Sequence, residues 1–268
     1  MSASPALLER LLRDTQERER AVVVKLVALA AIVLAALAFC GLFDAKRLAE
    51  GAPALVQIAR EMVPPDFTRW HAWLRPLLDT LAMSIGGTAI AITLSLPLAV
   101  CAARTTAPTS AVYQGARLLL NLFRAIPELI MGILCVAAVG FGALPGVLAL
   151  GVHSAGMVAK FFAEAVEHAD PRPIEAARAA GGSELQVISR AILPQVLPQM
   201  ADTAIYRWEY NFRASTVMGA VGAGGIGTEL IGSLRILDYR QVLAILIAIL
   251  VCVTLVDALG GMLRRRLA

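Results

Sequence analysis

Six apolar stretches, each long enough to cross a lipid bilayer, constrain the fold of this chain more than any other feature. A helix of about 20 residues spans a hydrocarbon core of ~30 Å while satisfying its own backbone hydrogen bonds. Apolar residues make up 58% of the 268, and mean hydropathy is +0.72. We therefore expect an all-α membrane protein with six transmembrane helices, over Ala21–Phe43, Leu77–Ala102, Val112–Phe141, Val147–Val166, Val196–Val221 and Gln241–Leu263.

The sequence predicts three segments. Residues 1–20 are charged and carry a leucine stripe, so we expect a cytoplasmic amphipathic segment on the membrane surface or in the cytosol. The apolar run that follows shows no small-residue cleavage site and is expected to be a retained helix, with residues 21–76 forming this first helix and a periplasmic linker. Residues 77–268 would form a five-helix core that includes a polar coupling loop at 171–194. The second apolar run of this core is expected to be interrupted at Pro127.

Composition argues against several function classes. The net charge is +4, but no basic stripe alternates with aromatic residues, so we expect no nucleic-acid partner. Four cysteines lie apart in apolar segments and three histidines show no ligand spacing, which predicts no metal and no cofactor. The glycine run Gly222–Gly227 follows no strand and precedes no Lys-Ser/Thr pair, so it predicts a close-packing turn. No catalytic constellation is present, and we expect no enzymatic activity.

The polar segment between the fourth and fifth apolar runs predicts a helical hairpin. Glu175, Ala176 and Ala177 suit a short helix, and Gly181-Gly182 permits a sharp turn. Ser183 can cap a second helix, and Pro194 stands where the next helix should begin. Leu185, Ile188 and Ile192 follow an apolar helical spacing on that second helix.

This hairpin resembles the EAA loop of ABC-importer permeases. The matching positions are Glu175, Ala176, Ala177, Gly181, Leu193 and Pro194, while Ala191 departs from the usual isoleucine. The resemblance implies that these residues couple the permease to a cytoplasmic ATPase. The distribution of Lys and Arg also favours cytoplasmic N- and C-termini, which independently places the hairpin in the cytoplasm.

A wider resemblance, over about Leu77–Leu263, is to the permeases of phosphonate importers. It is carried by LLLNLFRAIPEL, GVLALGVHSAGMVAKFFAEAVE and YNFRASTVMGAVGAGGIGTEL. The resemblance implies a type I ABC-importer bundle in the bacterial inner membrane that passes phosphonate, phosphite or a phosphate ester by alternating access. It also implies two copies of an ATP-binding subunit, an extracytoplasmic substrate-binding protein and a second permease chain, as a homodimer.

Charged residues inside the apolar runs are candidates for function, because burying a charge in a membrane is costly. The densest group is expected to line the bundle interior or a dimer interface, and its arginines suit a small anion. These translocation-pathway candidates are Arg207, Glu209, Asn211 and Arg213, and the alternative is a salt-bridge network that only holds the fold.

Two further charged pairs stand one helical turn apart. Arg124 and Glu128 flank Pro127 and can pair, or Arg124 marks a helix boundary and reaches the headgroups. Lys160 and Glu164 are expected to pair within their helix. Other readings of the whole chain remain open: a permease for methionine or a quaternary amine, or a membrane scaffold without transport.

Overall fold

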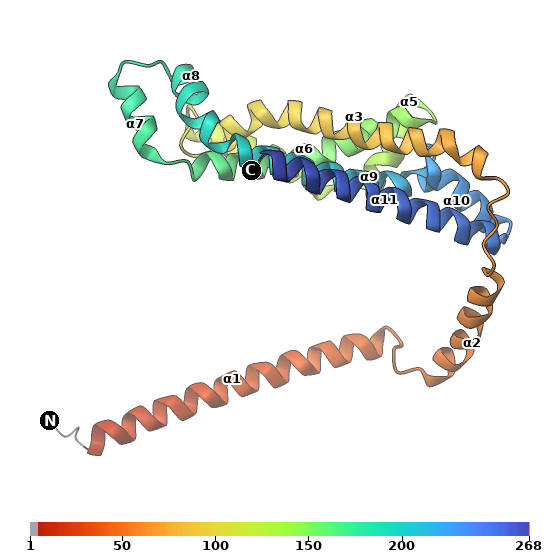
Figure 1. Ribbon diagram of the computed structural model, residues 1–268. Helices are drawn as coiled ribbons and strands as arrows, with labels where there is room; N and C mark the ends of the chain where they lie inside the picture. Colours follow the sequence, from red (N-terminus) through yellow and green to blue (C-terminus); the bar gives the residue numbers. More distant parts are fainter. Residues whose placement is uncertain (1–4, 268) are drawn as a thin grey trace. The chain divides into compact units, whose positions relative to one another are not determined.

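The computed structural model describes residues 5–267, and the chain divides into two compact units with the boundary between Glu61 and Met62 (Figure 1). The described residues are almost entirely helical, and they include no β-strand. The all-α prediction is therefore confirmed.

The first unit contains two helices, α1 (Pro5–Phe39) and α2 (Ala45–Glu61). The charged segment and the first apolar run, predicted as separate, form one continuous helix, because no glycine or proline interrupts the chain between Pro5 and Phe39. Its part Arg18–Phe39 is long and apolar enough to cross a membrane. The side chains of the predicted leucine stripe (Leu7, Leu8, Leu11, Leu12) lie outside those described, so a surface location of this stretch stays a prediction. Helix α2 was not predicted.

The second unit is a helical bundle with a polar hairpin at one end (Figure 1). Its long helices are α3 (Trp70–Ala102), α6 (Ala143–Glu167), α9 (Leu193–Met218) and α11 (Tyr239–Leu267), and its shorter ones are α4 (Ser110–Ala125), α5 (Glu128–Val139), α7 (Pro171–Ala179), α8 (Glu184–Val187) and α10 (Ile226–Arg235). A π-helical turn, Ile188–Ile192, joins α8 to α9, and a 3₁₀ turn, Gly219–Val221, follows α9.

Four of the described helices, including part of α1, can cross a membrane alone. Two bent pairs bring the number to six if each counts as one span: α4 with α5, bent by 87°, and the α8–α9 helix with α10, bent by 46°. The first bend lies at Ile126–Pro127, as the sequence predicts. The second bend lies at the glycine run, where a turn is predicted, but the turn is shorter than Gly222–Gly227 because α10 begins at Ile226.

Helix α6 forms the centre of the bundle and packs most extensively against α3. Glycines bring the two backbones together: a Cβ atom added to Gly87 would lie 2.9 Å from Cβ of Leu150, and one added to Gly151 would lie 2.7 Å from Cγ2 of Ile90. Inside lipid, such close packing of small residues replaces the hydrophobic drive that assembles a soluble core. Helices α4, α5 and α9 cover the remaining sides of α6.

Candidate functional site

The hairpin α7–α8 protrudes from one end of the bundle and is built by local capping (Figure 1). Asp170 caps α7, because its carboxylate accepts the backbone N–H of Arg172 at 3.0 Å. The Arg172 guanidinium also donates to both oxygens of that carboxylate and so holds the pKa of Asp170 below its usual value. The N-terminal end of α7 is thus fixed by contacts within this chain.

The turn between the two helices follows the prediction closely. Gly181 has φ of +81°, a conformation that other residues rarely adopt, and Ser183 forms a reciprocal capping box with Gln186. Pro194 occupies the first turn of α9 as expected, but no break separates it from α8. The chain instead passes through the π-helical turn, which contains Ala191, the position that departs from the family pattern.

The predicted coupling residues are mostly exposed. Glu175, Ala176, Gly181, Leu193 and Pro194 face outward, and Ala177 is half-buried. The predicted apolar stripe on the second helix is not one buried face, since Leu185 is 77% exposed while Ile192 is 3% exposed. An exposed leucine beside alanines and a carboxylate is a surface suited to contact with another protein.

The polar run of α9 divides into two faces. Arg207 and Asn211, four residues apart, point toward α6 and α3, and both are buried. Their hydrogen bonds form one chain: Arg207 Nε donates to Ser154 Oγ at 2.8 Å, and Ser154 Oγ donates to Asn211 Oδ1 at 2.8 Å. Asn211 Nδ2 then donates to Thr88 Oγ1 at 2.9 Å. One polar network therefore links α9, α6 and α3.

Glu209 and Arg213, also four residues apart, face α11. Glu209 is 5% exposed and pairs with Arg264, while Arg213 pairs with Asp257 at 3.1 Å. A Cβ atom on Gly260 would overlap the Glu209 carboxylate, so glycine makes the room for it. The salt-bridge network expected among Arg207, Glu209 and Arg213 does not form: Arg207 and Glu209, two residues apart, point to different sides of the helix, and Glu209 and Arg213 pair with Arg264 and Asp257 of α11 instead of with each other.

A second polar group lies at the bend between α4 and α5. Tyr210 donates a hydrogen bond of 3.4 Å to the carboxylate of Glu128, and the guanidinium carbon of Arg207 lies 4.2 Å from the centre of the Tyr210 ring. The predicted pair of Arg124 and Glu128 does not form. The predicted pair of Lys160 and Glu164 does form, at 3.7 Å.

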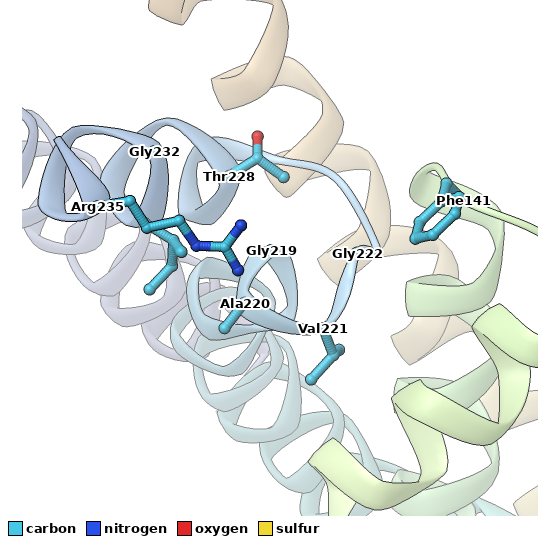
Figure 2. Close-up of a pocket in the computed structure, with 9 residues that line it drawn as sticks. Phe141, Gly219, Ala220, Val221, Gly222, Thr228, Gly232 and Arg235 are labelled. Carbon is cyan, nitrogen blue, oxygen red and sulfur yellow. The ribbon is translucent and has the colours of Figure 1, made fainter.

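A hollow of about 400 Å³ lies at the end of the bundle away from the hairpin, between Phe141 just after α5, the turn that follows α9, and α10. Figure 2 shows the Arg235 guanidinium directed over the turn at Gly219, with Phe141 on the opposite side. The close approach of α10 needs glycine, since a Cβ atom on Gly219 would overlap the backbone of Gly227 and Thr228. The glycine run is thus a close-packing turn, as predicted.

Residues 95–268 match the family model described as "Binding-protein-dependent transport system inner membrane component". The chain belongs to this family. A 64% identical relative, the phosphite transport system permease protein PtxC of Stutzerimonas stutzeri, aligns over 87% of this chain and 85% of its own length. A 41% identical relative, the phosphate-import permease protein PhnE of Mycolicibacterium smegmatis, aligns over 79% of this chain and 40% of its own length.

Solved structures show the same fold. A chain of the MetNI methionine ABC transporter in an inward-facing conformation superposes with a TM-score of 0.66 at 23% identity, over 73% of this chain and 96% of that one. A chain of an amino acid ABC transporter superposes with a TM-score of 0.60 at 19% identity. The match covers 72% of this chain and 93% of that one. The fold is therefore that of an ABC-importer permease, an inner membrane component, as the hairpin and the bundle indicate.

Proposed function

We propose that this chain is the membrane-spanning permease of an ATP-driven importer for phosphite, phosphonate or a related phosphorus oxyanion. The observation that carries the substrate class is the 64% identity to a phosphite permease over most of both chains. The probable D-methionine transport system permease protein of Pasteurella multocida is only 26% identical over 70% of this chain, which makes methionine the weaker alternative. Substrate moves through this subunit, and ATP is hydrolysed elsewhere.

The hairpin α7–α8 is the part that we propose to contact the ATP-binding subunit. Four of the coupling residues lie on or just after α7: Glu175, Ala176, Ala177 and Gly181. The other two, Leu193 and Pro194, begin α9. Because α8 continues into α9 without a break, movement of the hairpin would be transmitted into the bundle. Exposed Leu185 adds an apolar contact. Two such hairpins, one from each chain of a homodimer, would meet two copies of the ATP-binding subunit.

Charge supports a cytoplasmic location of the hairpin. The same end of the second unit carries Arg104, Arg117, Arg172, Arg178 and Arg190, and the C-terminal end of α11 with its three arginines points toward it (Figure 1). Excess arginine marks the cytoplasmic side of membrane proteins. We therefore propose cytoplasmic N- and C-termini, with the hollow beside Arg235 on the side of the extracytoplasmic substrate-binding protein.

The predicted pathway residues take two roles in this proposal. Arg207, Glu209 and Asn211 are buried within one chain and form the inner wall behind the pathway. The Arg213 side chain is 46% exposed, so it is the member of the set that reaches the surface where substrate passes. Movement of the hairpins would alternately open the cavity between the two chains to each side.

Growth tests this proposal. A strain that lacks this chain should fail to grow with phosphite or a phosphonate as sole phosphorus source and should recover when the gene is returned, while growth on excess inorganic phosphate stays normal. Equal growth of both strains on phosphite and on phosphonates would overturn the substrate assignment. A defect in methionine use instead would establish the alternative.

A further inference from the structure

Arg124, in the last turn of α4, is a cation without a partner. Its side chain is exposed, and the side chains described at residues 18–266 offer it no ion pair and no hydrogen bond. Arg117 on the same helix pairs with Glu167 at 3.0 Å, and Arg213 on α9 pairs with Asp257. Arg124 is therefore the arginine of this region whose charge remains free for a ligand.

The depth of Arg124 in the bundle excludes a simple boundary role. A Cβ atom added to Gly156, near the middle of α6, would lie 2.9 Å from Cγ of Arg124. Arg117, two turns earlier on α4, already lies at the end of α6, where it meets Glu167. At 1.5 Å per residue, Gly156 lies about 16 Å inside that end. An arginine at this depth does not mark the place where α4 leaves the membrane.

The half-buried stripe of α6 beside the α4–α5 bend includes polar side chains, and His153 Nδ1 lies 3.1 Å from the carbonyl oxygen of Ile126, two residues after Arg124. Helix α6 is largely buried, but a narrow stripe of half-buried side chains follows its axis, and three of them are His153, Lys160 and Glu164. The exposed surface of α11 is apolar by contrast, with Leu250, Val251, Leu255 and Leu259. Polar side chains at membrane depth face a water-filled cavity or another protein surface, because exposure to lipid is costly. The stripe and Arg124 therefore belong to a non-lipid face.

The charges around the bend leave an excess of one positive charge. Glu128 accepts a hydrogen bond from the Tyr210 hydroxyl while Arg207 lies over the Tyr210 ring, so these two opposite charges share one neighbour, and Lys160 pairs with Glu164. Arg124 is the charge that remains. The adjacent start of α5 has no side-chain cap, so its backbone N–H groups add to the positive potential.

We propose that Arg124 contacts the anionic substrate inside the translocation pathway, and that the α6 stripe is the wall along which the anion moves. A guanidinium group binds two oxygens of a phosphite or phosphonate at once, which an ammonium group does not. This assignment rests on the proposed function. It differs from the prediction made from sequence, which placed the anion-contacting residues on α9.

Transport kinetics test the contact. The complete importer, reconstituted in proteoliposomes with its binding protein and ATP, is compared as wild type, Arg124→Gln, Arg124→Lys and the control Arg60→Gln, an exposed arginine on α2. Loss of one charged contact lowers phosphite uptake roughly 10- to 100-fold in Arg124→Gln, with an intermediate loss in Arg124→Lys. The control transports normally. Wild-type uptake in Arg124→Gln would overturn the assignment.

Accessibility separates a substrate contact from a structural role. In a chain whose four native cysteines are replaced by alanine, a cysteine placed by Arg124→Cys reacts with a charged methanethiosulfonate, and phosphite with its binding protein slows the reaction. A cysteine placed by Leu122→Cys, also exposed but on the opposite side of α4, stays unreactive. Equal reaction at both positions, no reaction at position 124, or no protection by phosphite would refute the proposal.

The proposed function and this inference fail in different ways. A wild-type importer that accumulates no phosphorus oxyanion overturns the proposed function and, with it, the substrate assigned to Arg124. A wild-type importer that accumulates phosphite while Arg124→Gln does so equally well overturns the Arg124 contact alone.

Discussion

Replacing Asn211 by alanine should destabilise the bundle by a predictable amount. Asn211 is fully buried, accepts a hydrogen bond from Ser154 and donates one to Thr88, so it joins α9 to both α6 and α3. Asn211→Ala leaves the Ser154 hydroxyl without its acceptor and removes the donor to Thr88. The helices lose their central polar link.

The magnitude follows from the two lost bonds. Hydrogen bonds between transmembrane helices contribute about 0.6 kcal/mol on average and up to about 1.7 kcal/mol. Two of them give a loss of about 1–3 kcal/mol. For a domain of this size, the melting temperature falls by roughly 2–4 °C per kcal/mol. Asn211→Ala should therefore melt several degrees below the wild type.

Thermal unfolding of the purified chain in detergent, followed by tryptophan fluorescence, measures this effect. Asn121→Ala on α4 is the matched control, because Asn121 is exposed, and its melting temperature should not change. Combining Asn211→Ala with Thr88→Val should cost less than the sum of the single changes, since the two residues are partners. An unchanged melting temperature in Asn211→Ala, together with impaired uptake, would refute the structural role and favour direct contact with substrate.

Three further predictions concern the hairpin, the glycine turn and the ion pair between α9 and α11. Glu175→Arg should leave assembly of the complex intact, since Glu175 is exposed, but it should uncouple ATPase activity from phosphite uptake. Normal phosphite uptake in vesicles would show that Glu175 does not couple the permease to the ATPase. Gly219→Ala should lower the free energy of unfolding by about 1–3 kcal/mol, and with it the melting temperature, because the added methyl group overpacks against α10. The control Gly232→Ala, at a position with open space, should not lower the melting temperature. Equal melting temperatures of the two variants would contradict the close packing. Arg213→Ala should impair uptake in an assembled complex, and full uptake would limit Arg213 to its ion pair with Asp257.

The sequence predicts the elements that local chemistry determines. Apolar runs give most of the long helices, Pro127 gives the bend between α4 and α5, and Gly181 with Ser183 gives the hairpin turn. Each of these depends on residues that are neighbours in the chain. The same holds for the Lys160–Glu164 pair, which needs only one helical turn.

The remaining features depend on partners distant in sequence. Glu209 and Arg213 meet Arg264 and Asp257 of α11, and no pattern within α9 reveals those partners. Helix α10 begins directly after a glycine run, and that run masks the helix in the sequence. The sequence places Arg124 one turn before Pro127, but the depth of this arginine depends on the packing of its side chain against Gly156, which is distant in the chain. Two-face helical geometry, applied to the α9 run, would have predicted separate partners for Arg207 and Glu209.

ATP-dependent accumulation of phosphite tests the central claim most directly. The importer that contains this chain is reconstituted in proteoliposomes with its ATP-binding subunit and binding protein, and internal phosphite is measured over time with and without ATP. We expect phosphite to accumulate above its external concentration only when ATP is present, and excess methionine should leave this accumulation unchanged. Absence of accumulation, or competition by methionine, would contradict the central claim.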